Sequence, residues 1–266
     1  MKKNRFKHCL LILLVLAFSS SVAAQDQQFT VEQLKAKANE AFDKDDYKEA
    51  AMWFRMAAEK GDLSSQEFLS TLLEHGDEKS GLEKNEDEAL MWLTKAAEAG
   101  STSAQMTLAR KYKEGNGVVK NAQEAIKWYR MAAEKGNTDA MNRLGLLHDN
   151  KKEYQEAIKW YRMAAEKGNG PAMYDLGKMY YLRGLTKRGL PDDKKELNGE
   201  VVDFDKDDGL NSFAEAQKWF NKTIETYDRI SEDATTDPIG KAAAGMMKGN
   251  AEMYLEIVKK AIDRGK

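Results

Sequence analysis

The fifteen residues QEAIKWYRMAAEKGN, from Gln123 to Asn137, occur a second time without change from Gln155 to Asn169. In a helix, the first copy places one aromatic and two small residues on one face, at Ala125, Trp128 and Ala132. Gly136 follows Lys135, and glycine behind a cationic last turn is typical of a helix end because it adopts the left-handed conformation cheaply. The stretch predicts an amphipathic helix with a defined C-terminal end.

Three other segments paraphrase this block. They read EAAMWFRMAAEKGD (Glu49 to Asp62), EALMWLTKAAEAGS (Glu88 to Ser101) and, more distantly, EAQKWFNKTIE (Glu215 to Glu225). Their tryptophans and those of the two identical copies lie at positions 53, 92, 128, 160 and 219, so that four tryptophans follow one another at spacings of 39, 36 and 32 residues. Periods of this size indicate stacked units of two helices.

A second helix with small residues beside a leucine precedes or follows each block. The pattern is Ser65, Leu69 and Ser70; Ala104, Leu108 and Ala109; Ala140, Leu144 and Gly145; Ala172, Leu176 and Gly177. Small residues on one face allow neighbouring helices to approach closely. A single hairpin cannot bury its apolar face alone, so several hairpins must stack. The sequence predicts an all-α protein, a right-handed α-solenoid of about five helix-turn-helix repeats with a C-terminal capping helix after Asp237-Pro238.

These motifs resemble those of Sel1-like repeats, which are relatives of the tetratricopeptide repeats. The resemblance rests on the AxxW…AAEKG signature and on the segment YKEGNGVVKNAQEAIKWYRMAAEKG, whose glycine loop contains Gly115, Gly117 and Val118. It covers residues 30–182 well and residues 213–230 weakly. The resemblance implies a repeat scaffold and is nearly silent on activity.

We expect four segments along the chain. Residues 1–24 combine basic residues, an apolar run of about ten residues and small residues before Gln25, which is the pattern of a signal peptide. Residues 25–182 contain repeats one to four and the start of repeat five. Residues 183–212 form a polar, acidic insertion loop, and residues 213–266 contain the second helix of repeat five and the C-terminal capping helices. We therefore predict a periplasmic protein, with full secretion left open.

The residues with chemical potential are few. The single cysteine, Cys9, would be removed with the signal peptide. The remaining chain has 38 basic and 44 acidic residues, and this net charge of −6 argues against a nucleic-acid partner. His75 and His148 lie in different repeats, and we interpret His148 as a packing residue. The tryptophans are interpreted as core residues rather than a stacking platform. We expect no catalytic residues, no cofactor and no stable membrane insertion.

The segment DFDKDDG in the insertion is a weak candidate for calcium. Asp203, Asp205 and Asp207 have the alternate spacing with which an EF-hand loop begins. The glycine, Gly209, comes one position late, and position twelve is Ala214 instead of a glutamate. A solvated acidic loop is the favoured interpretation.

The first helices of such repeats line the concave side of a solenoid. Counting from the aligned leucines gives a candidate groove for a protein or peptide: Met106, Arg110, Lys113, Asn142, Tyr174, Lys178 and Tyr181. Arginine, tyrosine and methionine combine large contact area with directed polar groups. Binding through the insertion or the convex face is the alternative.

We therefore predict a non-catalytic, exported scaffold or adaptor for a protein partner, with its oligomeric state left open. The resemblance also implies an alternative role, an immunity protein that neutralises a toxic effector such as a phospholipase. A hydrolase is the rival from another class, and the sequence lacks the nucleophile and base motifs that this activity requires.

Overall fold

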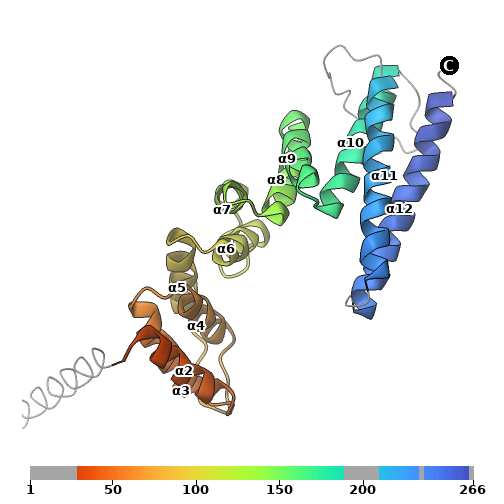
Figure 1. Cartoon of the computed structure of the whole chain (residues 1–266). Helices are drawn as coiled ribbons and strands as arrows, with labels where there is room; N and C mark the ends of the chain where they lie inside the picture. The colour runs from red at the N-terminus through yellow and green to blue at the C-terminus, as the bar shows by residue number, and fades with distance from the viewer. Residues whose placement is uncertain (1–28, 189–209, 234–236, 264–266) are drawn as a thin grey trace, which may run out of the picture. The chain divides into compact units, whose positions relative to one another are not determined.

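The computed structural model describes residues 29–188, 210–233 and 237–263, and these residues form α-helices joined by short turns (Figure 1). The chain divides into two compact units, Met1–Asn121 and Ala122–Lys266. The first contains α2 (Val31–Phe42), α3 (Tyr47–Glu59), α4 (Leu63–His75), α5 (Glu86–Glu98) and α6 (Thr102–Glu114). The second contains α7 (Ala122–Glu134), α8 (Thr138–Asn150), α9 (Tyr154–Glu166), α10 (Gly170–Arg188), α11 (Leu210–Glu232) and α12 (Pro238–Asp263).

Within each unit, helices that follow one another in sequence pack against one another. The part of the chain that the structure describes contains no β-strand, only an isolated antiparallel bridge between Asp77 and Leu82. The predicted all-α solenoid class is therefore confirmed.

The last two residues of the repeated block form the turn between helices. Gly136 and Gly168 both have a φ of 91°, as predicted for a glycine that ends a helix. The side chain of Asn137 then accepts a hydrogen bond from Ala140 N at 2.8 Å, and that of Asn169 accepts one from Ala172 N at 2.9 Å. Glycine ends one helix and asparagine begins the next, so the pair fixes the turn chemically.

Glycines inside helices mark the closest helix contacts of the second unit. A Cβ atom on Gly145 of α8 would lie 2.5 Å from ring carbons of Tyr161 in α9. A Cβ atom on Gly177 of α10 would lie 2.8 Å from Phe220 in α11. Each ring thus lies against the helix at the glycine, which confirms that the small residues of the motif allow close approach.

The predicted insertion loop is too long at both ends. Residues 183–188 belong to α10 and residues 210–212 belong to α11. The reason is a further contact of the same kind, because a Cβ atom on Gly184 would lie 2.6 Å from Phe213. The ring of Phe213 is fully buried, and this contact holds the end of α10 in helical form.

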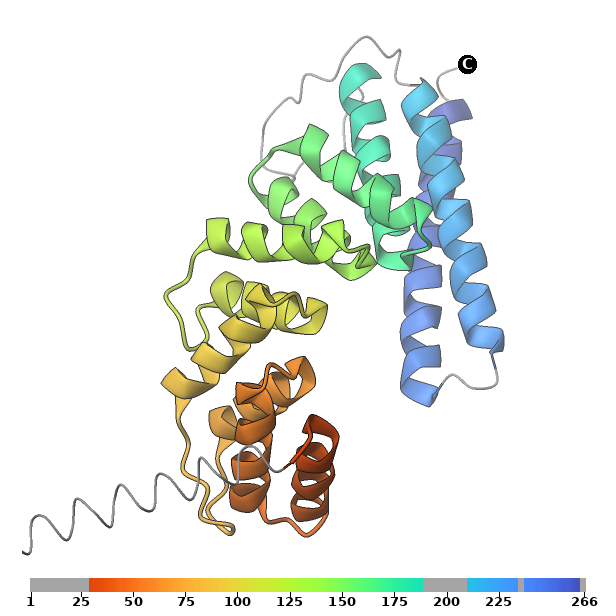
Figure 2. The same ribbon diagram turned by 60° about the vertical axis from the view of Figure 1, so that its left-hand side comes forward.

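The helix α12 packs against α11 and, over a smaller area, against α10 (Figure 2). Asp237 accepts hydrogen bonds from Ile239 N at 2.8 Å and Gly240 N at 2.9 Å, and Pro238 occupies the first turn. The ring of Tyr254 stacks on Phe220 with a centroid distance of 5.4 Å. The helix covers the last hairpin, as the sequence predicts.

Two predicted features lie outside the described residues. They are the signal peptide at residues 1–24 and the candidate calcium ligands Asp203, Asp205 and Asp207. Among the residues that are described, no helix has the length and apolar character needed to cross a membrane.

The close approach at Gly145 predicts opposite effects for two glycine substitutions. Gly145→Ala should lower the free energy of unfolding by about 2 kcal/mol, because the added methyl group must displace a buried ring. Gly249→Ala should raise it by about 0.5–1 kcal/mol, because no atom lies within 4 Å of that Cβ position and alanine favours helix. Urea unfolding followed by circular dichroism measures both. Equal effects of the two substitutions would contradict this account of the packing.

Candidate protein-interaction surfaces

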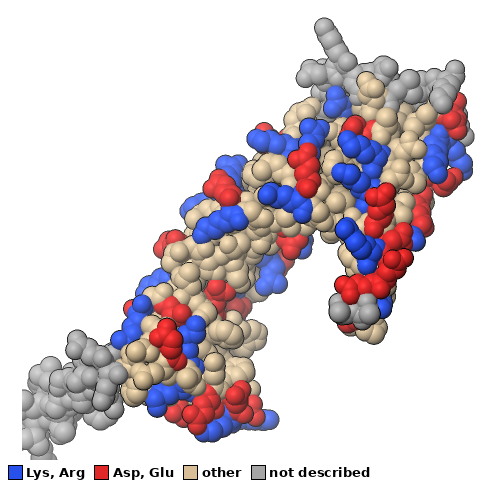
Figure 3. Space-filling view, in the orientation of Figure 1, with Lys and Arg blue, Asp and Glu red and all other residues tan. Residues whose placement is uncertain are grey.

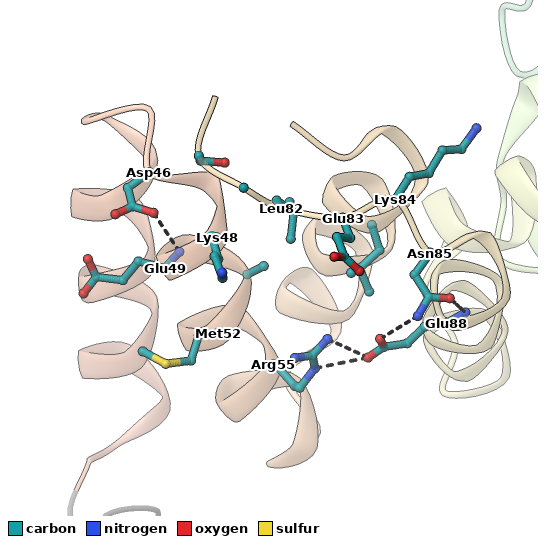
Figure 4. Close-up of a pocket in the computed structure, with 14 residues that line it drawn as sticks. Asp46, Lys48, Glu49, Met52, Arg55, Leu82, Glu83, Lys84, Asn85 and Glu88 are labelled. Atoms are coloured by element: carbon teal, nitrogen blue, oxygen red, sulfur yellow. Dashed lines mark hydrogen bonds and ion pairs between the residues drawn. The ribbon is translucent and has the colours of Figure 1, made fainter. Parts of the chain in front are cut away.

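A surface pocket of about 730 Å³ lies in the first unit, between α3, the segment 80–85 and the start of α5 (Figure 4). Helix α3 contributes Met52 and Arg55 to its wall, and α5 contributes Glu88. Helices α3 and α5 both carry the tryptophan motif, so the pocket belongs to the second helices of their repeats. It does not belong to the face predicted as a groove.

The connection between α4 and α5 is held in a fixed shape. Asp77 N donates to Leu82 O at 2.8 Å, and Leu82 N donates to Asp77 O at 2.9 Å. Asn85 N donates to Leu73 O at 2.8 Å, which returns the chain to α4. Gly76 has a φ of 65°, and a Cβ atom there would lie 2.8 Å from Lys84 N. The pocket wall is therefore tied to the helices on both sides.

An ion pair in the pocket wall joins the two helices. Arg55 donates to Glu88 Oε1 from Nη2 at 2.8 Å and from Nε at 3.1 Å (Figure 4). The same carboxylate accepts from Trp92 Nε1 at 3.2 Å and from Asn85 Nδ2 at 3.4 Å. Because Glu88 is held by three side chains, Arg55 is fixed in one direction before any partner binds.

The pocket rim combines apolar and charged groups. Met52 is 46% exposed and places an apolar side chain at the rim. Lys48, Glu49 and Glu83 lie around it, so the rim carries both signs of charge. Figure 3 likewise shows basic and acidic residues mixed over the face that it displays. Mixed charges around an apolar centre are the usual composition of a protein interface.

The predicted groove residues of the first unit lie on α6. Arg110 is exposed, and Met106 and Lys113 are partly exposed. Their neighbour Lys111 forms an ion pair of 2.6 Å with Glu74 of α4, and Ser101 hydrogen-bonds Glu67 of α4. These links hold α6 against α4 and leave Met106, Arg110 and Lys113 at the surface.

The predicted groove residues of the second unit are mostly packed against other side chains. Tyr181 is only 9% exposed, with ring contacts to Phe213 at 6.1 Å and Tyr254 at 5.9 Å, so its assignment to the groove is wrong. Tyr174 also contacts Tyr254, at 5.8 Å. The capping helix covers both tyrosines because α10, α11 and α12 share one core.

Asn142 and Lys178 complete the predicted set. Asn142 is 8% exposed, so the prediction that it is a surface contact residue is also wrong. Lys178 is partly exposed and lies 3.8 Å from Asp175 Oδ1 on the same helix. The structure brings Lys178 into a cluster of acidic residues that the sequence analysis did not select.

That cluster consists of Asp149, Asp175, Tyr161 and Lys178. Burial raises the pKa of Asp175 to about 6, with Lys178 opposing the shift and Asp149 adding to it. Burial also raises the pKa of Asp149. The pKa of Tyr161 is raised by burial and by the charges of Asp175 and Asp149. In the sequence, only Asp175 pointed to this cluster. It stands directly before the motif leucine, where other repeats have Phe68, Thr107 and Arg143.

The histidine and tryptophan interpretations agree with the structure. His148 is 7% exposed, and its Nδ1 lies 2.5 Å from Glu153 Oε2. Four of the five tryptophans are buried, and Trp53 is partly buried against Phe29. The tryptophans are packing residues. Among the described residues, no group of three or more His, Cys, Asp or Glu side chains is placed to hold a metal ion.

The model of the Sel1 repeat matches residues 43–62, 63–101, 102–137, 138–169 and 170–195. The chain belongs to the Sel1 repeat family. Proteins of this family are typically non-catalytic scaffolds, and the repeat points to protein–protein interaction. Helices α2, α11 and α12 lie outside the matched repeats and extend the array at both ends.

The chain is similar to several solved structures. A Sel1 repeat protein from Oxalobacter formigenes is 24% identical with a TM-score of 0.53, over 84% of this chain and 88% of that one. A protective antigen of uropathogenic Escherichia coli is 23% identical with a TM-score of 0.46, and the match spans 88% of this chain and 58% of the antigen. An immunity protein from Pseudomonas aeruginosa is 19% identical with a TM-score of 0.38, over 87% and 82% of the two chains. No curated protein matched the sequence.

The raised pKa of Asp175 predicts a specific pH dependence. The folded chain keeps a proton that the unfolded chain releases between about pH 3.8 and 6, so this residue's contribution to stability falls as the pH rises through that window. Asp175→Asn should remove the effect. At pH 7.5 the variant should have a higher free energy of unfolding, relative to the unsubstituted chain, than it has at pH 3.5. The change between the two pH values should be at most about 3 kcal/mol.

Urea unfolding at both pH values measures this difference. Glu156→Gln is the matched control, because its side chain is 51% exposed and lies on another helix. An Asp175→Asn curve parallel to that of the unsubstituted chain at all pH values would refute the assignment of a buried, proton-binding carboxyl group.

Proposed function

We propose that this protein is an exported, non-catalytic scaffold that binds another protein, and that the pocket between α3 and α5 is part of the binding surface. The repeat architecture supports a scaffold, since stacked helix pairs present an extended surface to a partner. The observation that carries the proposal is the exposed Met52 beside the fixed Arg55 in one pocket.

The chemistry of Arg55 favours a protein partner. A guanidinium group carries five N–H donors, and Arg55 uses two of them on Glu88. The remaining donors can bind carbonyl or carboxylate groups of a partner. Because the side chain is already oriented, binding loses less conformational entropy than it would for a mobile arginine.

The surface of α6 is a second candidate within the same unit. Met106, Arg110 and Lys113 remain partly or fully exposed there, as the concave-groove hypothesis requires. The pocket between α3 and α5 is the preferred site, because it combines an exposed apolar side chain with an arginine held in a fixed ion pair.

The role as an immunity protein is a narrower form of the same function. It requires the partner to be a toxic effector, such as a phospholipase, whereas a general adaptor would bind an envelope protein. The identity of the bound protein therefore separates these two roles, and the shape of the scaffold does not.

Met52→Glu should abolish most partner binding, because a charge would replace the apolar centre of the pocket. Met91→Glu is the matched control. Met91 occupies the same position before the motif tryptophan on α5, is 42% exposed and does not line the pocket. Crosslinking in intact envelopes, affinity capture and mass spectrometry would show one dominant protein that is lost with Met52→Glu and kept with Met91→Glu.

The double variant Arg110→Ala and Lys113→Ala tests the α6 surface in the same experiment. Loss of the partner in this variant alone would assign binding to α6. Retention of the partner in Met52→Glu would refute the pocket, and the lack of any captured protein above background would refute the scaffold.

Export predicts removal of residues 1–24. The protein recovered from the periplasmic fraction should begin at Gln25, as measured by intact mass and N-terminal sequencing. Replacing the basic residues Lys2, Lys3, Arg5 and Lys7 by glutamate should retain the full-length chain in the cytoplasm. A chain that keeps its first residue and stays in the cytoplasm without these changes would contradict the proposal.

A further inference from the structure

The helix α12 leaves one apolar face exposed. Its large apolar side chains Ile239, Met246 and Met253 are 82%, 70% and 45% exposed and follow one another at intervals of seven residues. The exposed small residues Ala242 and Gly249 lie between them. Alternating steps of three and four residues are the pattern with which one helix packs along another. We call these five residues the outer seam.

The other helices of the second unit pack against the opposite side of α12. Ala244, Ala251 and Val258 lie there, also at intervals of seven residues, and are at most 2% exposed. Figure 1 shows α12 as the last helix of this unit, beside α11. The outer seam therefore faces away from the core that α12 shares with α11 and α10.

Two exposed glycines of α12 have no packing role within the described chain. The helical glycines of α8 and α10 are each covered by an aromatic ring, as Gly177 is by Phe220. Gly245 and Gly249 also lie within a helix, yet no described atom lies within 4 Å of a Cβ atom added to either. Glycine inside a helix costs about 0.5–1 kcal/mol relative to alanine. Because no neighbour within the unit requires this cost, the two glycines favour close approach of a helix from another molecule.

The charges at the two ends of α12 favour a second copy of this chain in the antiparallel direction. Glu232, Asp233 and Asp237 are exposed where α11 ends and α12 begins. Lys259 and Lys260 are exposed near the other end of α12. In an antiparallel pair, the basic end of each α12 lies beside the acidic end of the other, whereas a parallel pair places like charges together.

The spacing of the outer seam is complementary to itself. When Met246 of one copy lies against Gly249 of the other, the same antiparallel register places Met253 against Ala242. Two-fold symmetry repeats both contacts. Each large side chain then lies against a small residue, as aromatic rings lie against glycines elsewhere in this unit. The next position of the seam, Glu256, is charged and ends the apolar contact.

We propose that this protein forms a two-fold symmetric dimer through antiparallel contact between the outer seams of two copies. The inference goes beyond the proposed function, because it concerns a second copy of this chain and not the partner protein. Residues 239–253 give a contact about 22 Å long, at 1.5 Å per helical residue. A contact of this size suits a weak, reversible dimer. The dimer carries two copies of the pocket between α3 and α5, which strengthens binding to a partner that offers two binding sites.

Sedimentation equilibrium of the exported chain, residues 25–266, over a concentration series measures the dimer directly. We expect a monomer–dimer equilibrium with a micromolar dissociation constant. Met246→Glu should raise this constant at least about tenfold, because the two-fold axis brings two negative charges into the apolar contact. Met163→Glu is the matched control and should leave it unchanged, because Met163 is 37% exposed on α9, outside the seam. Circular dichroism checks that both variants fold.

Cysteine crosslinking tests the antiparallel register, because residues 25–266 contain no cysteine of their own. Ala242→Cys and Met253→Cys are made in separate chains, one of which carries an affinity tag. The mixture should form a disulfide between the two variants on oxidation. Each variant alone should form none, because its two copies of the cysteine lie about 16 Å apart along the helices, beyond the reach of a disulfide.

Three results would overturn the dimer. They are a chain that stays monomeric at submillimolar concentration, a dimer that persists with Met246→Glu, and disulfides that form within each single cysteine variant but not between the two. Capture of an envelope protein that is lost with Met246→Glu, by a chain that is monomeric, would assign the outer seam to that protein instead. These outcomes leave the scaffold function intact, because that function is tested by capture of a partner with variants of the first unit.

Discussion

The contact of an aromatic ring with the backbone of a neighbouring helix at glycine is the constraint on which the second unit depends. It recurs at Gly145 with Tyr161, at Gly177 with Phe220 and at Gly184 with Phe213. Each contact sets how closely two helices approach, and the rings then determine which residues remain at the surface. In the first unit Ser70 stands at the corresponding place, and its hydroxyl group donates to Ala89 O at 2.7 Å, which joins α4 to α5 by a hydrogen bond instead.

The residue before the tryptophan explains why the two units present different surfaces. It is methionine at 52 and 91, and the glutamate four residues before the tryptophan then accepts the indole N–H, as in Glu49 with Trp53 and Glu88 with Trp92. In the second unit this residue is lysine, and the glutamates pair with Lys127, Lys159 and Lys218. The indole groups of Trp128, Trp160 and Trp219 then have no hydrogen-bond partner among the described residues. Because residue 91 is methionine and not lysine, Glu88 pairs with Arg55 of α3 and orients it in the pocket wall.

The fold was predictable because it depends on local and periodic features. The tryptophan spacing, the glycine and asparagine pair at the helix turns, and the small residues beside leucine all act within one hairpin or between adjacent ones. The extension of α10 to Arg188 was not predictable, because its cause is a contact between Gly184 and Phe213, on opposite sides of the insertion. Tyr181 was misassigned for a related reason, since the face it occupies is covered by α12, which has no counterpart in the earlier repeats.

The candidate sites were less predictable than the fold because each depends on an exception to the repeat. The pocket needs the connection between α4 and α5, whose fixed shape comes from the bridge of Asp77 with Leu82 and from no periodic signal. The acidic cluster needs a carboxyl group on Asp175, where other repeats have Phe68, Thr107 and Arg143. Repeats that share one core therefore acquire different surfaces by single substitutions such as the one at Asp175.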